Sequence, residues 1–435
     1  MVRHKHWLLL FAAVCLTIVL FSVLFTGSGD STKPSAGVKS AEDEPNPEQG
    51  SVEKQVKMAV SMQQKEFAVL QQLKEQYQAS HPGIDIRLEN IPDETVYTKL
   101  KKAAQLGDAP DIMLLDNYWV SEFAALGYVL PVDSMFTGSM QAEQMEQALA
   151  QVKWNGYLWG VPKNLDSYVV VYNTKRLNEW GELPPANADE LVQLHKQLHK
   201  PEEGKYGLDF AAPDYRSFLT LARILGGAKT ASKTAPLELA DPNVQRTLEL
   251  FLFEDARQLS KSFPQQSATW KPWEQLLQGK LAAYLTTFSD WKQNESAAVT
   301  MTAIPLPKGE EAWKGPWLSG KSFTISARSQ SAKESFDWIR ELVSSNAAVR
   351  FWSAAGVFPA QTSGYVSSIK NDPAFKNVAA YIDLDDAVPT APQRARQLTA
   401  LQGGLEQLWR GELTFKTFLE RTTAEWNAII PSAKP

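Results

Sequence analysis

Cysteine is almost absent from this sequence. The 435 residues include one, Cys15, which lies inside an apolar stretch near the N-terminus. The rest of the chain has no thiol, which excludes disulfide bonds, cysteine-ligated metals and cysteine nucleophiles from its folded part. Stability must therefore come from the packing of apolar cores, and a chain of this length can bury enough surface for two domains.

Histidine is scarce as well, with five in the chain. His195 and His199 have the spacing of two metal ligands on one helix face, but no Glu follows the first and no third ligand is evident. We therefore predict a solvated helix face there, with no metal and no cofactor. The sequence has no glycine-rich phosphate loop, G-x-S-x-G or H-E-x-x-H motif. A pair of catalytic carboxylates stays open, because 49 acidic residues allow many pairs.

Neither sign of charge dominates. The chain has 44 Lys and Arg against 49 Asp and Glu, for a net charge of −5, and the two signs are interspersed. This pattern indicates neither a nucleic-acid partner nor a polybasic membrane-binding patch. We therefore expect a small molecule as the partner.

One long apolar run stands out, from Trp7 to Phe25, with Arg3 and Lys5 before it. About 19 residues of helix span the hydrocarbon core of a bilayer, and the basic residues place the N-terminus inside and the rest of the chain outside. We predict that residues 1–27 form a retained transmembrane anchor. A cleaved signal peptide is the alternative, although it would have a shorter apolar core and an Ala-x-Ala-like site. Cys15 lies in the middle of the run, so lipidation is not predicted.

Residues 28–51 follow the apolar run and are rich in Ser, Pro, Gly and Glu, with almost nothing to bury. This composition predicts a flexible stalk. Beyond the stalk, apolar residues alternate as in strands over 56–60 and 84–88, and they have helical spacing over 67–77 between these. A further strand is predicted over 112–115. Strands that alternate with helices predict an α/β fold with a mainly parallel sheet covered on both faces.

Tryptophan is unusually frequent, with 14 in the chain. Several of them stand beside Gly, Pro, Asp or Asn rather than within apolar helix faces. A sugar presents flat C–H faces and a rim of hydroxyl groups, so a sugar site needs aromatic rings flanked by polar groups. Packing in the core is the alternative for each ring. The tryptophans of this kind are Trp119, Trp154, Trp159, Trp291 and Trp317.

Six segments in order resemble family 1 extracellular solute-binding proteins, the relatives of maltose-binding protein. The longest match is Trp154–Pro162 followed by Leu165–Asn173, which is similar to the family segment that crosses between its two lobes. The other matches are Gly107–Ile112 with Ala125–Pro131, Leu225–Gly227, Gln278–Ala283 before Trp291, Ile304–Pro307, and Ser335–Ile339 with Gly356–Pro359.

The resemblance implies a two-lobe periplasmic-binding-protein-like fold of type II. Each lobe is then a mainly parallel sheet flanked by helices, and the ligand is enclosed between the lobes as they close about a hinge. The implied first lobe comprises residues 52–166 and 322–372, and the second comprises 167–321 and 373–435. The N-terminal anchor and the stalk precede them.

The same resemblance implies the ligand-binding residues. Asp116 and Trp119 lie in a first-lobe loop, and Asp166 with Asn164 occupies the crossing segment, where a carboxylate accepts sugar hydroxyls. Alternatives stay open: Asp116 as a strand-terminating cap, Asp166 as a turn residue before a strand, and Tyr215 and Trp291 as core residues. Gln63 lies where the segment 61–64 departs from the family pattern of an aromatic and a polar ligand residue. The full set is Gln63, Asp116, Trp119, Asn164, Asp166, Tyr215, Trp291, Ser319 and Gly320.

We therefore predict a monomeric, non-catalytic binding protein on the extracytoplasmic face of the cell membrane, or secreted if the N-terminal segment is cleaved. It would capture a sugar or oligosaccharide and deliver it to the permease of an ABC importer. Two alternatives belong to other classes: an accessory protein that presents a ligand to a sensor kinase, and a membrane-tethered carbohydrate-active enzyme. The sequence does not identify the ligand.

Overall fold

The computed structural model describes residues 54–136, 138–211, 213–226, 239, 242–252, 270–297, 299–302, 315–382 and 391–429. The predicted anchor at 1–27 and the stalk at 28–51 lie outside the described residues, so both stay predictions. Within the described part of the chain, no helix is long and apolar enough to cross a membrane.

The first lobe combines parallel and antiparallel strand pairing. Strand β1 pairs in parallel with β2 and β3, and β10 joins β3 in the antiparallel sense. Its core combines residues of the strands and the covering helices, such as Val56, Leu70 and Leu114. The elements are β1 (Lys54–Val60), α2 (Gln64–Ser80), β2 (Ile84–Asn90), α3 (Asp93–Leu106), β3 (Ile112–Asp116), α4 (Asn117–Ala125), α5 (Ser139–Ala142), α6 (Glu146–Val152), β4 (Lys153–Trp154), β5 (Tyr157–Leu158), β10 (Leu318–Ile325), α13 (Ala332–Leu342) and α14 (Ser345–Ala355).

Local sequence explains several element ends in this lobe. The apolar stripe of α2 buries Val69, Leu70 and Leu73 at helical spacing. Helix α3 ends at Gly107, whose φ of 78° is the left-handed conformation that glycine adopts without strain. Asn155 and Gly156, with φ values of 50° and 83°, form the tight turn that joins β4 to β5.

The second lobe has a shorter sheet with more antiparallel pairing. Strand β7 pairs in parallel with β8, whereas β8 and β9 both pair antiparallel with β6. A mainly parallel sheet was predicted for each lobe. This prediction was wrong for the described strands, because β10 and β6 run antiparallel to their neighbours where the chain crosses between the lobes. The elements are β6 (Val161–Asn173), α7 (Thr174–Glu179), α8 (Ala188–Leu198), η1 (Pro201–Glu203), β7 (Tyr206–Phe210), α9 (Tyr215–Ile224), α10 (Pro242–Leu252), α11 (Pro272–Leu277), β8 (Leu281–Thr287), α12 (Phe288–Gln293) and β9 (Val299–Thr302).

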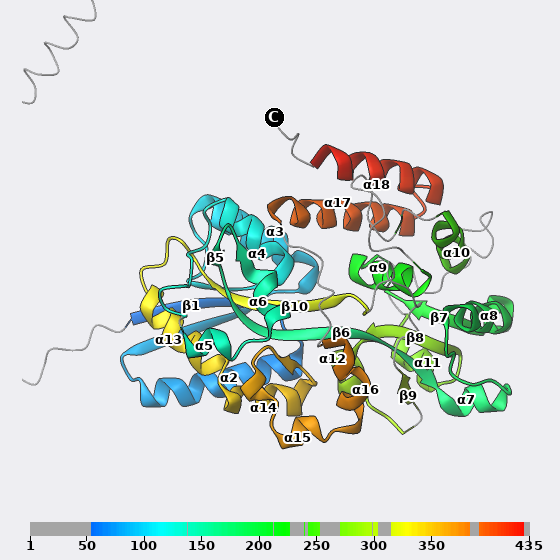
Figure 1. Cartoon of the computed structure of the whole chain (residues 1–435), viewed down its shortest axis with the longest axis horizontal. Coiled ribbons are helices and arrows are strands. Elements are labelled where there is room, and N and C mark those ends of the chain that lie inside the picture. The colour runs from blue at the N-terminus through cyan, green and yellow to red at the C-terminus, as the bar shows by residue number, and fades with distance from the viewer. Residues whose placement is uncertain are drawn as a thin grey trace, which may run out of the picture. The chain divides into compact units, whose positions relative to one another are not determined.

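Strand β6 passes from one lobe to the other. Val161–Ser167 pairs with β10, and from Tyr168 onward β6 pairs with β8. Figure 1 shows β6 running between the first-lobe strands and the green second-lobe elements. The change of partner after Ser167 agrees with the predicted lobe boundary, which itself stays a prediction.

The last part of the chain returns to the second lobe. Helix α17 packs against α18 and α9 and also contacts α4 of the first lobe; α17 and α18 lie side by side in Figure 1. The two lobes therefore touch along α17 as well as through β6. The remaining elements are β11 (Phe358–Pro359), η4 (Thr362–Gly364), α15 (Ser367–Lys370), α16 (Pro373–Ile382), α17 (Pro392–Trp409) and α18 (Phe415–Ile429).

The histidine pair of α8 does not lie on a solvated face, so that prediction was wrong. His195 and His199 are both buried and their rings stack, with centroids 4.7 Å apart. The Nδ1 atom of His195 accepts a hydrogen bond from the backbone N–H of Leu208 at 3.1 Å, and Gly207 leaves room for the helix to approach β7. Burial lowers the pKa of both imidazoles. This pair is part of the packing between α8 and β7.

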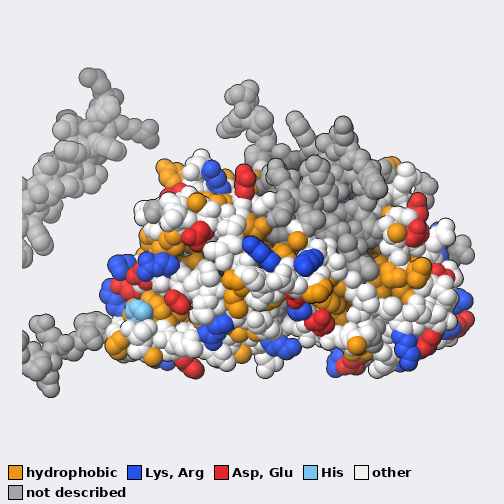
Figure 2. Space-filling view, turned by 60° about the horizontal axis from the view of Figure 1, so that its bottom comes forward, with side chains coloured by type: hydrophobic (Ala, Val, Ile, Leu, Met, Phe, Trp, Pro, Cys, Tyr) orange, Lys and Arg blue, Asp and Glu red, His pale blue; other side chains and the backbone are white. Residues whose placement is uncertain are grey.

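Charges of both signs are interspersed on the face that Figure 2 shows. The sequence predicted this pattern. In the part of the chain that the structure describes, no group of three or more His, Cys, Asp or Glu side chains could hold a metal ion.

Candidate functional site

Five of the nine predicted ligand residues lie on three neighbouring strands. In the antiparallel pairing of β10 with β6, Ser319 is opposite Asp166 and Lys321 is opposite Asn164. On the other side of β10, Lys321 is opposite Asp116, the last residue of β3. The sheet therefore brings together segments far apart in the sequence, at the point where β6 leaves the first lobe. The five are Asp116, Asn164, Asp166, Ser319 and Gly320.

Gly320 allows these strands to approach closely. A Cβ atom at this position would stand 2.5 Å from Nδ2 of Asn117 and 2.6 Å from the backbone oxygen of Asn164, which any larger residue would have to displace. Buried hydrogen bonds fix the neighbouring amide: Asn117 donates to Gln151 at 2.7 Å and accepts from Ser322 at 2.6 Å. Gly320 thus serves packing at the centre of the group.

Asp116 joins the two lobes. Its side chain is buried, and Oδ1 caps α4 by accepting the backbone N–H of Tyr118 at 2.9 Å. Oδ2 accepts from Nη2 of Arg216, in the first turn of α9, at 2.5 Å. Nη1 of the same guanidinium lies 3.2 Å from Asp214, which caps α9 and accepts from the hydroxyl of Tyr168 at 2.7 Å. Asp116 therefore ends β3 and caps the helix that follows, and the same carboxylate also makes an ion pair between the lobes.

A second ion pair lies near the first and joins Lys321 of β10 to Asp93 at the start of α3. The ammonium of Lys321 donates to the backbone oxygen of Ser61 at 2.7 Å and stands 3.2 Å from Asp93. Lys321 is the main cause that lowers the pKa of Asp93 to about 2, and Arg216 and the hydroxyl of Ser61 act in the same direction. Cations and carboxylates therefore alternate at the lobe junction.

Asp166 links β6 to the start of α12. Its carboxylate accepts from the hydroxyl of Ser289 at 2.5 Å, from the backbone N–H of Ser289 at 3.3 Å and from that of Ser167 at 3.0 Å. Burial raises the pKa of Asp166 to about 6, and these hydrogen bonds oppose the shift. The residue as a whole is partly exposed.

Tyr215 and Trp291 are each 5 % exposed and pack as the core alternative expects. The Tyr215 ring meets Trp317 edge-on at 5.9 Å and has the Arg216 guanidinium 4.7 Å above it. Trp291 packs on Phe288 at 5.3 Å. Within the described part of the chain, the Tyr215 hydroxyl and the Trp291 indole N–H find no hydrogen-bond partner. Their assignment as ligand-binding residues stays a prediction.

Gln63 and Trp119 stand apart from the group on β3, β6 and β10. Gln63 is exposed before α2, and its side chain does not cap that helix. Lys65 nearby donates from its ammonium to the backbone oxygen of Gln293 in α12 at 3.1 Å, so the start of α2 does face the second lobe. Trp119 packs on Tyr97 of α3 at 5.1 Å, within the first lobe.

Sequence reasoning missed the charged residues that surround Asp116. Asp214 and Arg216 follow β7 directly, and in open α/β sheets ligands bind beyond the carboxyl ends of strands. That rule could have singled out this loop. Lys321 had a weaker signal, because one lysine in a strand gives no indication of its partner. The missed residues are Ser61, Asp93, Tyr168, Asp214, Arg216 and Lys321.

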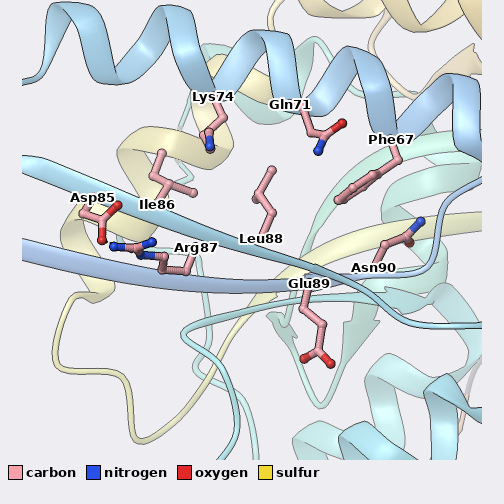
Figure 3. A pocket seen from close by; sticks show the side chains of 9 residues that line it. All are labelled: Phe67, Gln71, Lys74, Asp85, Ile86, Arg87, Leu88, Glu89 and Asn90. Carbon is pink, nitrogen blue, oxygen red and sulfur yellow. Dashed lines mark hydrogen bonds and ion pairs between the residues drawn. The ribbon is translucent and has the colours of Figure 1, made fainter.

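A pocket of about 530 Å³ lies elsewhere, between α2 and the edge strand β2. Figure 3 shows Phe67, Gln71 and Lys74 of α2 pointing toward the strand, and Ile86 and Leu88 pointing back toward the helix. The backbone N–H of Ile86 on this edge is already bonded by the side chain of Gln78 at 3.2 Å. None of the nine predicted ligand residues lines this pocket.

Comparison with known proteins gives both fold and family. The chain is 23% identical over 363 residues to a maltotriose-binding protein of Pyrococcus abyssi, a match that covers 80% of this chain and 76% of the relative. Two solved structures of similar fold both have a TM-score of 0.73. One is the maltose/maltodextrin-binding domain MalE of Bdellovibrio bacteriovorus with maltotriose, at 19% identity over 87% of this chain and all of that one.

The other is an ABC transporter solute-binding protein of Thermotoga lettingae with α-D-tagatose, at 18% identity over 86% of this chain and 99% of that one. These likenesses establish the two-lobe α/β fold. The model of the family described as bacterial extracellular solute-binding protein matches residues 63–349, well over half of the chain. This protein therefore belongs to the bacterial extracellular solute-binding protein family.

Proposed function

We propose that this protein binds a neutral sugar or oligosaccharide at the lobe junction and delivers it, without catalysis, to an ABC importer. The observation that carries the proposal is the group of polar residues on β3, β6 and β10, which meets Arg216 of the second lobe. The relatives named for maltotriose, maltodextrin and tagatose support a sugar as the ligand class.

The chemistry of the junction suits hydroxyl groups. A sugar hydroxyl both donates and accepts, so it can donate to a carboxylate such as Asp116 or Asp166 while it accepts from Arg216 or Lys321. The two cations already have carboxylate partners at 2.5 Å and 3.2 Å. An anionic ligand would have to displace those carboxylates, whereas a neutral ligand can share them.

The cellular setting follows from the family and from the N-terminal sequence. The family is extracellular, and we propose that Trp7–Phe25 holds this chain at the outer face of the membrane as a monomer beside the importer's permease. Arg3 and Lys5 before the run are the observation that supports this orientation.

Ligand binding can be tested directly on the full chain by thermal unfolding with a panel of sugars. We expect maltotriose or another neutral oligosaccharide to raise the unfolding temperature, because a ligand at 100 times its dissociation constant stabilises the folded state by about 2.7 kcal/mol. Calorimetry should then give one site per chain. Stabilisation by amino acids or peptides, with no response to any sugar, would contradict the proposed ligand class.

Asp166→Asn tests the predicted contact. We expect it to weaken sugar binding about 10- to 150-fold at pH 8, because hydrogen bonds to charged groups contribute about 1.5–3 kcal/mol. Wild-type affinity should also fall as the pH is lowered through about 6, where the carboxylate takes up its proton, whereas the Asn variant should vary little. Calorimetry from pH 5 to pH 8 measures both.

Ser289→Ala is the matched control for this variant. It removes the internal partner of Asp166 but leaves the carboxylate in place, so sugar affinity should change only a few-fold. Unchanged affinity in folded Asp166→Asn protein would remove Asp166 from the ligand site and leave it the structural role of holding α12 against β6.

A further inference from the structure

Arg216 forms an ion pair that spans the two lobes. It begins the second-lobe helix α9, and its Nη2 stands 2.5 Å from Oδ2 of Asp116, at the end of the first-lobe strand β3. The exposed fractions of the two side chains are 17% and 3%, so water screens the pair only weakly. This short polar contact comes from residues 100 positions apart in the sequence.

Both partners are held in place from their own lobes. Asp116 is fixed as the cap of α4, since its other oxygen accepts the backbone N–H of Tyr118. Arg216 is fixed by Asp214 at 3.2 Å and by the face of the Tyr215 ring at 4.7 Å. Neither side chain needs to reorganise to form the pair, so the entropic cost of forming it is small.

The pair belongs to a zone where the lobes touch. Helix α17 packs against both α4 and α9, and Gln402 of α17 accepts the backbone N–H of Tyr215 at 3.1 Å. Separating the lobes would pull Asp116 from Arg216 and let water reach both charges. Loss of Arg216 would leave the buried Asp116 carboxylate without this cation, and loss of Asp116 would leave Arg216 paired within its own lobe, with Asp214. Either change removes the ion pair between the lobes and would therefore favour separation.

We propose that the ion pair of Arg216 with Asp116 holds the two lobes together in the absence of ligand. Arg216 then competes with an entering ligand for Asp116. A ligand that donates a hydrogen bond to Asp116 replaces one guanidinium N–H. The strength of the Arg216–Asp116 ion pair therefore also determines how much this hydrogen bond adds to the affinity for the ligand. The first part of this inference goes beyond the proposed function, because it states how the unliganded protein is held; the competition for Asp116 rests on the proposed function.

The test measures the separation of the lobes in the full chain without ligand. Spin labels are placed on Lys333→Cys in α13 and Lys416→Cys in α18, whose side chains are 83% and 85% exposed, in a Cys15→Ser background. Double electron–electron resonance in detergent or nanodiscs then gives the distribution of distances between the lobes. The pair is broken by Arg216→Gln and, independently, by Asp116→Asn, which can still cap α4.

We expect both variants to shift the distance distribution toward longer and broader values, with the ratio of separated to closed molecules raised about ten- to hundredfold. Arg87→Gln is the control, because it removes the same charge from an exposed pair on β2, and it should match wild type. Circular dichroism confirms that each variant is folded. If Arg216→Gln and Asp116→Asn both gave the wild-type distance distribution, the proposed role of the ion pair would be overturned, whether or not sugars bind.

Discussion

Glu66→Ala should destabilise the folded protein by about 3–5 kcal/mol, because it leaves the buried ammonium of Lys163 without its partner. Oε1 of Glu66, on α2, lies 2.5 Å from Nζ of Lys163 on β6. The Lys163 side chain is 2% exposed and stands 4.3 Å above the ring of Phe351. Denaturant unfolding of variant and wild type measures the loss.

Two further variants separate this effect from a general sensitivity to mutation. Replacing both partners by apolar residues of similar size, Lys163→Met with Glu66→Leu, should cost far less than the single change, because no unpaired charge is left. Glu274→Ala breaks an exposed pair with Lys271 and should cost about 1 kcal/mol or less. A loss below about 1 kcal/mol for Glu66→Ala would show that water reaches Lys163.

The sequence predicted the regular elements of the first lobe well. Strands expected over 56–60, 84–88 and 112–115 are β1, β2 and β3, and the helix expected over 67–77 lies within α2. These segments supply apolar residues to the core of the first lobe, so their hydrophobic pattern follows the fold. The family resemblance predicted the two-lobe architecture, which no single segment could show.

Strand β6 crosses between the lobes, and local sequence pattern does not predict its first half. Its first half contains Lys163, Asn164 and Asp166, which do not look like a central strand, yet Lys163 and Asn164 are buried. They are tolerated there because Lys163 has Glu66 as its partner and Asn164 lies between β10 and β11. The partners that make these buried polar residues tolerable come from distant segments, so the local sequence pattern cannot reveal them.

The same reason limits prediction of the site. Asp116 was found from its place in a family motif, but its partner Arg216 was not, because nothing in either segment specifies the other. The prediction for the histidine pair was wrong for a different reason. Its i, i+4 spacing on α8 was read correctly, but the face was assigned to solvent because two histidines and nearby lysines look polar, while β7 in fact covers it.

Asp209 makes the stability of the second lobe depend on pH. This buried residue of β7 accepts the indole N–H of Trp270 at 2.7 Å and the backbone N–H of Phe210 at 2.8 Å. Burial outweighs these hydrogen bonds and raises its pKa to about 7. Between about pH 4 and pH 7 the folded protein therefore holds a proton that the unfolded chain releases. The Asp209 carboxyl group therefore lowers the free energy of unfolding as the pH rises through this range.

Asp209→Asn should remove that loss. An amide is neutral at every pH but cannot accept both hydrogen bonds, so we expect the variant to be no more stable than wild type at pH 5. By pH 8 the comparison should reverse, because each pH unit between pH 5 and the folded pKa of about 7 is worth about 1.36 kcal/mol, so the relative gain from pH 5 to pH 8 is about 2.7 kcal/mol. Denaturant unfolding of both proteins at pH 5, 6, 7 and 8 gives the difference at each step. Parallel profiles would mean that Asp209 is ionised in the folded protein throughout, with water reaching the carboxylate beside Trp270.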